Sequence, residues 1–157
     1  MDHNFKWIIV LLLGLLDDII YNNSHFFLTK YLKGNLNAMS SLSLLQPLKL
    51  GDLTLKNRVV LAPLSRGRCG KDEVPAEVNE LYYVQRVSAG LVITEATHIS
   101  KQGTGWAGAA SCYNNDHIKG WRAVTNAIHN NGGIIFMQMW HMGRVTHSSF
   151  HGLQPLR

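Results

Sequence analysis

The chain is poor in cysteine and proline, and each shortage excludes a class of protein. Its two cysteines, Cys69 and Cys112, fit neither a disulfide-dense secreted scaffold nor a four-ligand zinc site. Four prolines and 14 glycines among 157 residues are too few for a collagen-like or low-complexity chain, and a hydrophobic content of 46% is too high for a disordered one. The length suits one ordinary domain or a piece of a larger one.

Basic residues exceed acidic residues, but they form no cluster. Lys and Arg number 15 and Asp and Glu number 10, which gives a net charge of +5. Residues 1–45 hold three residues of each sign, so the whole excess lies in residues 46–157. There it is scattered, without the basic run or helical stripe that would follow a phosphate backbone. We interpret it as a solvated basic surface that can meet an anionic ligand, rather than as a nucleic-acid interface.

Residues 1–43 differ in character from the rest of the chain. Residues 7–16 (WIIVLLLGLL) are an apolar run that is too short for a membrane span of about 20 residues. The run suits the apolar core of a secretory signal, but no clear cleavage site follows it. Met39 then opens a second plausible start. We expect residues 1–43 to be an extension outside the fold and the protein to be cytoplasmic and not membrane-bound, with a true signal sequence as the alternative.

Beyond residue 55, short apolar runs alternate with helical patterns. Apolar and β-branched runs predict buried strands over residues 58–64, 91–96 and 134–140, and three- and four-residue spacings predict helices over residues 76–89 and 116–130. The side chains expected to face inward are Val78, Leu81, Tyr82 and Ala89 on the first helix and Trp121, Val124 and Ile128 on the second. This β-α-β-α-β order predicts a parallel sheet, either doubly wound or the first part of an eight-stranded barrel.

Polar side chains stand at the carboxyl end of each predicted strand. They are Ser65 and Arg66 for the first strand, Thr94, Glu95 and Thr97 for the second, and Gln138 and His141 for the third. Ligands of parallel α/β folds bind at this edge, so the set predicts a site for a planar polar ligand. No strand is followed by the glycine spacing of a phosphate-binding turn, which disfavours the Rossmann and P-loop classes. Residues 98–115 form a long loop rich in small residues, a kind of loop that is usually functional.

Three segments carry a family resemblance. They are LLQPLKLGDLTLKNRVVLAPLSR (residues 44–66), YYVQRVSAGLVITEAT (residues 82–97) and QMWHMGR (residues 138–144). In this order and at these separations they resemble the opening third of the old yellow enzyme family of NADH:flavin oxidoreductases, and most of all the plant 12-oxophytodienoate reductases. The resemblance implies an FMN-binding (β/α)8 TIM barrel, of which residues 44–157 would be a partial, truncated domain with about three of eight strands.

The resemblance also implies roles for six residues. Pro63, Leu64 and Ser65 would lie along the flavin, with the Ser65 hydroxyl near the flavin O4. Ala96 would take a flavin contact commonly made by a small residue, Gln138 would hydrogen-bond the pyrimidine edge, and Trp140 would line the substrate pocket. The alternative for each is structural, since Ser65 could cap a turn, Ala96 could be small for packing, and Trp140 could belong to the core.

Other polar residues are expected to be structural. Four histidines, His98, His141, His147 and His151, do not have the spacing of a metal-ligand set, so no metal is expected. Glu95 lies on a buried strand and is expected to pair with a basic group rather than to act as a catalytic base.

The resemblance implies an FMN-dependent NAD(P)H oxidoreductase that reduces the C=C bond of enones. In the family, the pair that binds the substrate carbonyl and the tyrosine that donates a proton come after the fourth strand, so no catalytic residue is expected within this chain. We therefore expect an N-terminal fragment that is inactive alone. The alternative is a non-enzymatic truncated product that acts only by binding a partner or a full-length relative.

Overall fold

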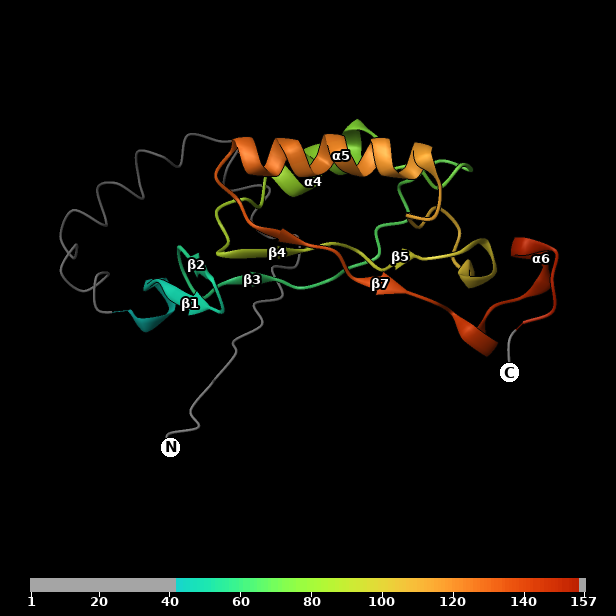
Figure 1. Ribbon diagram of the computed structural model, residues 1–157, viewed down its shortest axis with the longest axis horizontal. Helices are drawn as coiled ribbons and strands as arrows, with labels where there is room; N and C mark the ends of the chain where they lie inside the picture. The colour runs from blue at the N-terminus through green and yellow to red at the C-terminus, as the bar shows by residue number, and fades with distance from the viewer. Residues whose placement is uncertain (1–41, 156–157) are drawn as a thin grey trace, which may run out of the picture.

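The computed structural model describes residues 42–155 (Figure 1). The predicted extension, with its apolar run, therefore lies almost entirely outside the described residues. The described part opens with a 3-10 turn, η1 (Ser43–Leu45), and an antiparallel hairpin of β1 (Leu48–Leu50) and β2 (Leu53–Leu55). Gly51, with φ +58°, makes the tight turn between these strands. The hairpin was not among the predicted elements, and it lies at one end of the sheet (Figure 1).

A three-stranded parallel sheet forms the centre of the fold. Its strands are β3 (Val60–Leu61), β4 (Leu91–Ile93) and β6 (Ile135–Phe136), in the order β3-β4-β6. The pairs are parallel because each connection crosses over through a helix. These helices, α4 (Glu77–Val84) and α5 (Asn115–Asn130), lie on the same side of the strands in Figure 1. The predicted β-α-β-α-β order and parallel sheet are confirmed.

Two of the predicted strands are interrupted. The strand predicted over residues 91–96 ends at Ile93, and a second parallel pair, β5 (Thr97–His98) and β7 (Met139–Trp140), begins beyond the break. At the break a side chain replaces a backbone partner, since the Thr94 hydroxyl accepts the backbone N–H of Gln138 at 3.0 Å. The strand predicted over residues 134–140 is divided into β6 and β7 at the same place.

The core lies between the sheet and the two helices. Tyr83 of α4 and Trp121, Val124 and Ile128 of α5 pack with Val92 of β4 in one buried cluster. The rings of Tyr83 and Trp121 are 6.2 Å apart. The inward face predicted for the second helix is therefore confirmed. No helix within residues 42–155 is long and apolar enough to cross a membrane.

The inward face predicted for the first helix is only partly confirmed, since Tyr82 packs against the core cluster but two other members of that face do not. Val78 and Leu81 are 52% and 55% exposed, whereas Asn79 and Tyr83 are buried. Asn79 turns inward because its side-chain oxygen accepts the backbone N–H of Ala76 at 3.0 Å, at the start of the helix. Its side-chain nitrogen also donates to the buried Glu95 carboxylate at 3.3 Å, so this distant hydrogen bond, rather than the spacing of apolar residues, sets the rotation of α4.

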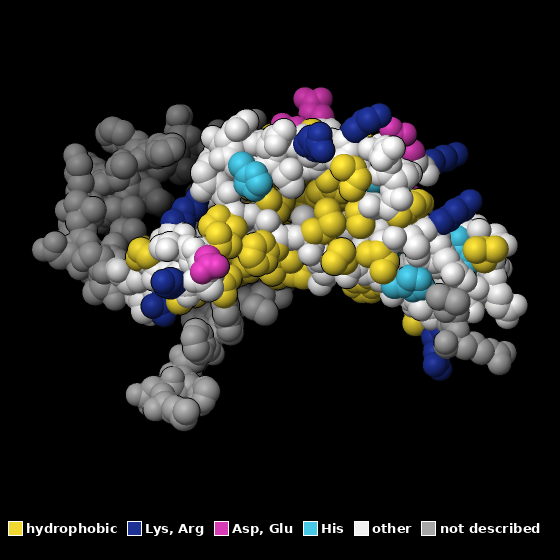
Figure 2. All heavy atoms as spheres, viewed as in Figure 1, with side chains coloured by type: hydrophobic (Ala, Val, Ile, Leu, Met, Phe, Trp, Pro, Cys, Tyr) yellow, Lys and Arg dark blue, Asp and Glu magenta, His cyan; other side chains and the backbone are white. Residues whose placement is uncertain are grey.

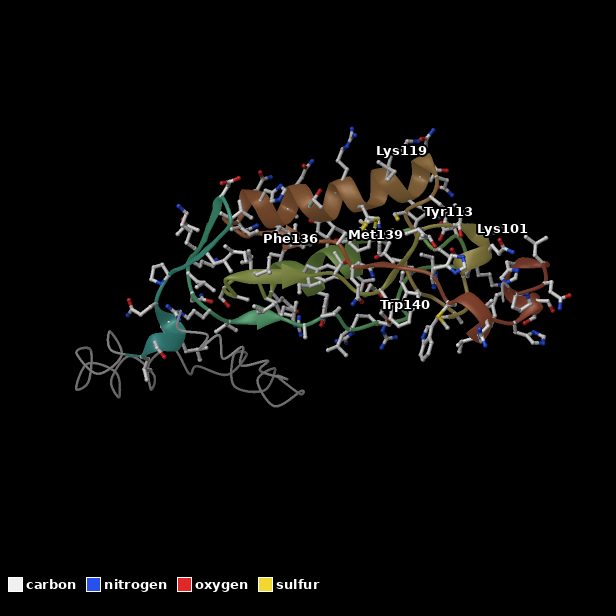
Figure 3. All side chains as sticks on the ribbon, turned by 60° about the horizontal axis from the view of Figure 1, so that its bottom comes forward. Lys101, Tyr113, Lys119, Phe136, Met139 and Trp140 are labelled. Atoms are coloured by element: carbon white, nitrogen blue, oxygen red, sulfur yellow. The ribbon has the colours of Figure 1, made fainter. Side chains whose placement is uncertain are left out.

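The two helices cover only one face of the sheet. Ile135 packs against the core on the helix side, so Phe136 points to the opposite face because side chains alternate along a strand. Phe136, Met139 and Trp140 follow one another along β6 and β7 (Figure 3) and are 45%, 71% and 42% exposed. Figure 2 shows hydrophobic side chains in a band across the middle of the molecule, below α5. Nothing in the described part of the chain covers Phe136 and Met139.

Three short segments complete the described part. The 3-10 turn η2 (Lys101–Gly103) belongs to the loop between β5 and α5, and η3 (Gly143–Val145) and α6 (Ser148–His151) follow β7. They lie at the end of the molecule opposite the hairpin (Figure 1).

Candidate functional site

A hollow of about 220 Å³ opens at the carboxyl ends of the strands. Because the strands are parallel, the segments that follow them meet at one edge, although they are far apart in sequence. The lining residues come from the segments after β3 and β4, from β5 and β7, and from the loops beyond them: Ser65, Ala96, His98, Trp106, Ala109, Trp140 and Met142.

Three of the six predicted site residues line this hollow. Ser65 follows β3, Ala96 directly precedes β5, and Trp140 belongs to β7, so each comes from a different one of the three predicted strands. Ala96 is 6% exposed, and because its side chain is a single methyl group it takes up little of the space in the hollow. The Ser65 hydroxyl has no hydrogen-bond partner within the described residues. The fold thus brings together three side chains that the family resemblance placed at one site.

The other three predicted residues, Pro63, Leu64 and Gln138, do not line the hollow. Pro63 is half-buried and Leu64 is 45% exposed. Both backbone polar groups of Gln138 are hydrogen-bonded, because its N–H donates to the Thr94 hydroxyl and its carbonyl accepts the N–H of Thr97 at 2.9 Å. Its half-buried side-chain amide makes no hydrogen bond to any described residue. That amide is therefore free to bind a ligand.

Four lining residues were missed at the sequence level, namely His98, Trp106, Ala109 and Met142. His98 stands two positions after Ala96, and residues two apart on a strand share a face, so this spacing could have identified it. Trp106 and Ala109 belong to the long loop predicted to be functional. Nothing in the sequence indicates which side chains of that loop turn toward the strands.

The loops after β3 and β5 meet at two glycines. The backbone N–H of Cys69 donates to the Gly108 carbonyl at 2.9 Å, and a Cβ atom on Gly108 would lie 2.7 Å from the carbonyl oxygen of Gly67. Gly108 also has φ +71°, which other residues rarely adopt. A side chain at position 108 would therefore push apart the loops that carry Ser65 and Trp106.

A buried carboxylate supports the segment that carries Ala96. Glu95 is 1% exposed, and its carboxylate accepts the backbone N–H of Arg66 at 3.1 Å and the side-chain amide of Asn79 at 3.3 Å. The backbone N–H of Glu95 donates to the Tyr83 hydroxyl at 2.8 Å. Burial raises the pKa of Glu95, and these hydrogen bonds oppose the rise. The carboxylate thus ties the loop that follows β3 to α4 and to the end of β4.

The predicted ion pair of Glu95 with a basic group is wrong. Arg66 meets Glu95 through its backbone, while its guanidinium lies over the Tyr82 ring, 4.3 Å from the ring centroid. The one ion pair within residues 42–155 joins Lys119 and Asp116 on the exposed side of α5. The hydrogen bonds to the carboxylate come from neutral N–H donors instead, and the charge of Arg66 acts on it without an ion pair.

The four histidines do not converge. His141 accepts the backbone N–H of Gly143 at 2.9 Å, and His147 and His151 likewise accept backbone N–H groups two residues further on. Each of the three therefore closes its own local turn. In the part of the chain that the structure describes, no group of three His, Cys, Asp or Glu side chains could hold a metal ion.

Comparison with known proteins assigns the chain to a family. Residues 43–154 match the NADH:flavin oxidoreductase / NADH oxidase family, and the chain belongs to this FMN-dependent family. Flavin oxidoreductase hxnT of Emericella nidulans is 44% identical over 123 residues, which cover 73% of this chain and 32% of that protein. 12-oxophytodienoate reductase 2 of Arabidopsis thaliana is 40% identical over 124 residues, covering 78% and 32%. The chain thus spans about a third of the length of these curated relatives.

Solved structures define the fold. The old yellow enzyme homologue from Zymomonas mobilis matches with a TM-score of 0.70 and 48% identity, covering 72% of this chain and 32% of that one. Morphinone reductase in complex with tetrahydroNAD matches with a TM-score of 0.70 and 44% identity, covering 72% and 31%. The predicted fold class is confirmed, since the described residues are part of an FMN-binding (β/α)8 barrel rather than a doubly wound sheet.

The residues at the hollow, together with Leu64 and Gln138 outside its lining, fit the FMN of this family. The small side chain of Ala96 leaves space for a flat ring, and Leu64, 45% exposed, offers apolar surface beside it. The Ser65 hydroxyl and the Gln138 amide are free to hydrogen-bond, as the polar edge of a flavin requires.

Proposed function

We propose that the described residues form the flavin-facing wall of an ene-reductase that reduces the C=C bond of α,β-unsaturated carbonyl compounds at the expense of NAD(P)H. The observation that carries this proposal is the convergence of Ser65, Ala96 and Trp140, from three successive strand ends, on one hollow. A relative from Leishmania infantum, 44% identical over 103 residues, bears the name of a probable flavin mononucleotide-dependent alkene reductase, which supports this substrate class. When bound at this wall, FMN would supply the hydride-transfer chemistry that links NAD(P)H to the alkene.

The chain's own part in this reaction is to bind and orient the ring. Ser65 and Gln138 would donate hydrogen bonds to its polar edge, which favours negative charge there. Pro63 and Leu64 would lie along the ring, and Ala96 would allow its close approach. Trp140, 42% exposed and lining the hollow, would bound the space left for the enone.

We assign no catalytic acid to residues 42–155. Reduction of an enone needs donors that polarise the carbonyl group and an acid that protonates the α-carbon. No tyrosine lines the hollow, and the carboxylates of Glu73 and Glu95 lie outside its lining. We therefore expect the 157-residue chain alone to show no ene reduction.

The test uses the whole 157-residue chain fused in frame to the part of the Zymomonas mobilis homologue that it does not cover, here called the completed chain. We expect the completed chain to be yellow, to retain FMN through gel filtration, and to oxidise NADPH in the presence of 2-cyclohexenone. Gln138→Ala should weaken FMN binding by about 1–3 kcal/mol, the cost of leaving one buried hydrogen bond unmade. Gln85→Ala is the matched control, because Gln85 is exposed at the end of α4, away from the hollow.

Two results would count against the proposal. Equal FMN affinity in the Gln138→Ala and Gln85→Ala variants would remove the assigned role of Gln138. A completed chain without FMN would contradict the proposal as a whole. If the 157-residue chain also bound tightly to an intact relative, that result would favour a non-enzymatic role in which the open sheet face docks on a partner.

A further inference from the structure

We propose that His98 is a specificity-determining residue of this site, whose imidazole presents a hydrogen-bond acceptor to the ligand and selects substrates that carry a hydroxyl or N–H donor. The inference rests on the proposed function, because it takes the hollow to be the substrate side of the flavin site.

The position of His98 is fixed from both sides. It lies in β5, opposite Trp140 of β7 in the parallel register, and both side chains line the hollow. Its backbone N–H donates to the Ala110 carbonyl at 2.9 Å, and its carbonyl accepts the N–H of Cys112 at 2.9 Å. The residue is 2% exposed. These bonds fix the backbone of His98, and its ring is enclosed by its neighbours rather than exposed to solvent.

The neighbours of the ring select its tautomer. The Nδ1 atom of His98 lies 3.5 Å from the Ser111 Oγ, at the outer limit of a hydrogen bond. The Ser111 hydroxyl proton is committed to the Glu73 carboxylate, so the Ser111 oxygen is left to accept. Nδ1 then carries the proton, and Nε2 is an unprotonated acceptor. No described residue hydrogen-bonds Nε2.

His98, Ser111 and Glu73 thus form a relay of hydrogen bonds, and the Glu73 carboxylate at its end is itself held in place. The hydroxyls of Thr104 and Tyr113 donate to the same Oε2 atom of Glu73 at 3.4 and 3.3 Å, and the backbone N–H of Ser111 donates to its carbonyl at 3.0 Å. Glu73 is the non-glycine residue with positive φ, +61°, within the described part. Backbone strain of this kind persists only where surrounding contacts enforce it.

The charged state of His98 follows from its surroundings. Burial lowers its pKa below the ordinary value of 6.5, the Glu73 carboxylate opposes this change, and His141 adds to it. Glu73 precedes α4 and His141 follows β7, and these are the titratable groups that act on the ring. The imidazole is therefore neutral at pH 7 and accepts a hydrogen bond. In acid it becomes a donor, and the preference should turn toward ligands with an acceptor or negative charge.

The test compares 2-cyclohexenone with 4-hydroxy-2-cyclohexenone as substrates of the completed chain. We expect the hydroxylated enone to have a KM lower by about five- to tenfold at neutral pH, as one added hydrogen bond predicts. His98→Leu should abolish the advantage, and His98→Gln should restore part of it. Ser111→Ala should reduce the advantage without changing kcat for 2-cyclohexenone. His129→Leu, at an exposed position of α5, is the matched control.

A second measurement does not need the bound flavin. Exchange of the imidazole C2 hydrogen, followed by mass spectrometry on the 157-residue chain, reports the pKa and accessibility of each histidine in any oligomeric state. His98 should exchange more slowly than His129 and with a pKa below 6.5, and Glu73→Gln should lower that pKa further.

The outcomes separate the two proposals. A yellow, active completed chain in which His98→Leu keeps the full preference for the hydroxylated enone overturns the role of His98 and leaves the proposed function standing. Exchange at His98 as fast as at His129 overturns it as well, because the ring would then not be held. A completed chain that binds no FMN overturns the proposed function and this inference with it.

Discussion

The hydroxyl of Tyr83 offers a sharp test of how the strand end beside Ala96 is held. Tyr83 is 1% exposed, and its oxygen accepts the backbone N–H of Glu95, itself 1% exposed, at 2.8 Å. Tyr83→Phe removes that acceptor and leaves a buried N–H without a partner, which costs about 1–3 kcal/mol. The ring contacts with Tyr82 at 5.1 Å and Trp121 at 6.2 Å are retained. The loss should therefore measure the hydroxyl alone.

The neighbouring residue supplies the control. The hydroxyl of Tyr82 makes no hydrogen bond within residues 42–155. The guanidinium groups of Arg66 and Arg86 lie over its ring, with their Cζ atoms 4.3 and 3.9 Å from the ring centroid. A phenylalanine ring can hold both cations, so Tyr82→Phe should change the free energy of unfolding by less than about 0.5 kcal/mol.

Urea unfolding of the completed chain, followed by tryptophan fluorescence, measures both variants. Tyr83→Phe should lower the unfolding midpoint without changing the dependence on urea, since the surface exposed on unfolding stays the same. If the free energies of unfolding of the two variants agreed within about 0.5 kcal/mol, the reasoning would be refuted, because the Glu95 N–H would then have found another partner.

Three further predictions concern ionisation, thiols and the uncovered sheet face. Because burial raises the pKa of Glu95 in the folded state, its contribution to stability is complete below its unfolded pKa and is lost as the pH rises through the folded pKa. Glu95→Gln should therefore gain stability relative to the parent as the pH rises above the unfolded pKa of a glutamate, about 4.3, and urea midpoints that run parallel would contradict this. Burial raises the pKa of the Cys69 thiol to about 12, so iodoacetamide should modify half-buried Cys112 first, and equal rates by peptide mass spectrometry would argue against a closed core. The 157-residue chain should self-associate through its exposed apolar face, and sedimentation velocity should show less association for Met139→Lys but not for Leu81→Lys, at another exposed position, on α4; equal effects would assign the association to general hydrophobicity.

Local patterns in the sequence determined the order of elements and the packing of α5. A buried strand needs a continuous apolar run, and a helix on one face of a sheet needs apolar residues three and four apart. Trp121, Val124 and Ile128 meet that condition, and all three are buried. The three family segments added the barrel, which periodicity could not distinguish from a doubly wound sheet.

The rotation of α4 was decided only by tertiary structure. Apolar spacing favours Val78 and Leu81 as the inward residues, yet Asn79 is buried because it serves both the N-terminal end of the helix and the carboxylate of Glu95. A hydrogen-bond partner that is distant in sequence leaves no trace in local periodicity. The break between β4 and β5 has the same origin, since Thr94 bonds to Gln138, 44 positions further along the chain.

The site residues likewise divide into those that the sequence indicated and those that only the folded chain revealed. Ser65 was identifiable because it stands at a predicted strand end, whereas Ala96 and Trp140 were assigned through the family resemblance. Parallel strands bring such residues to one edge whatever their separation in sequence. His98 could have been identified from its spacing to Ala96, whereas the place of Trp106 depends on how the loop between β5 and α5 folds back. The contact of Gly108 with Gly67 and the relay from Glu73 through Ser111 fix that loop. These contacts join positions that no short pattern connects, so only the folded chain could reveal them.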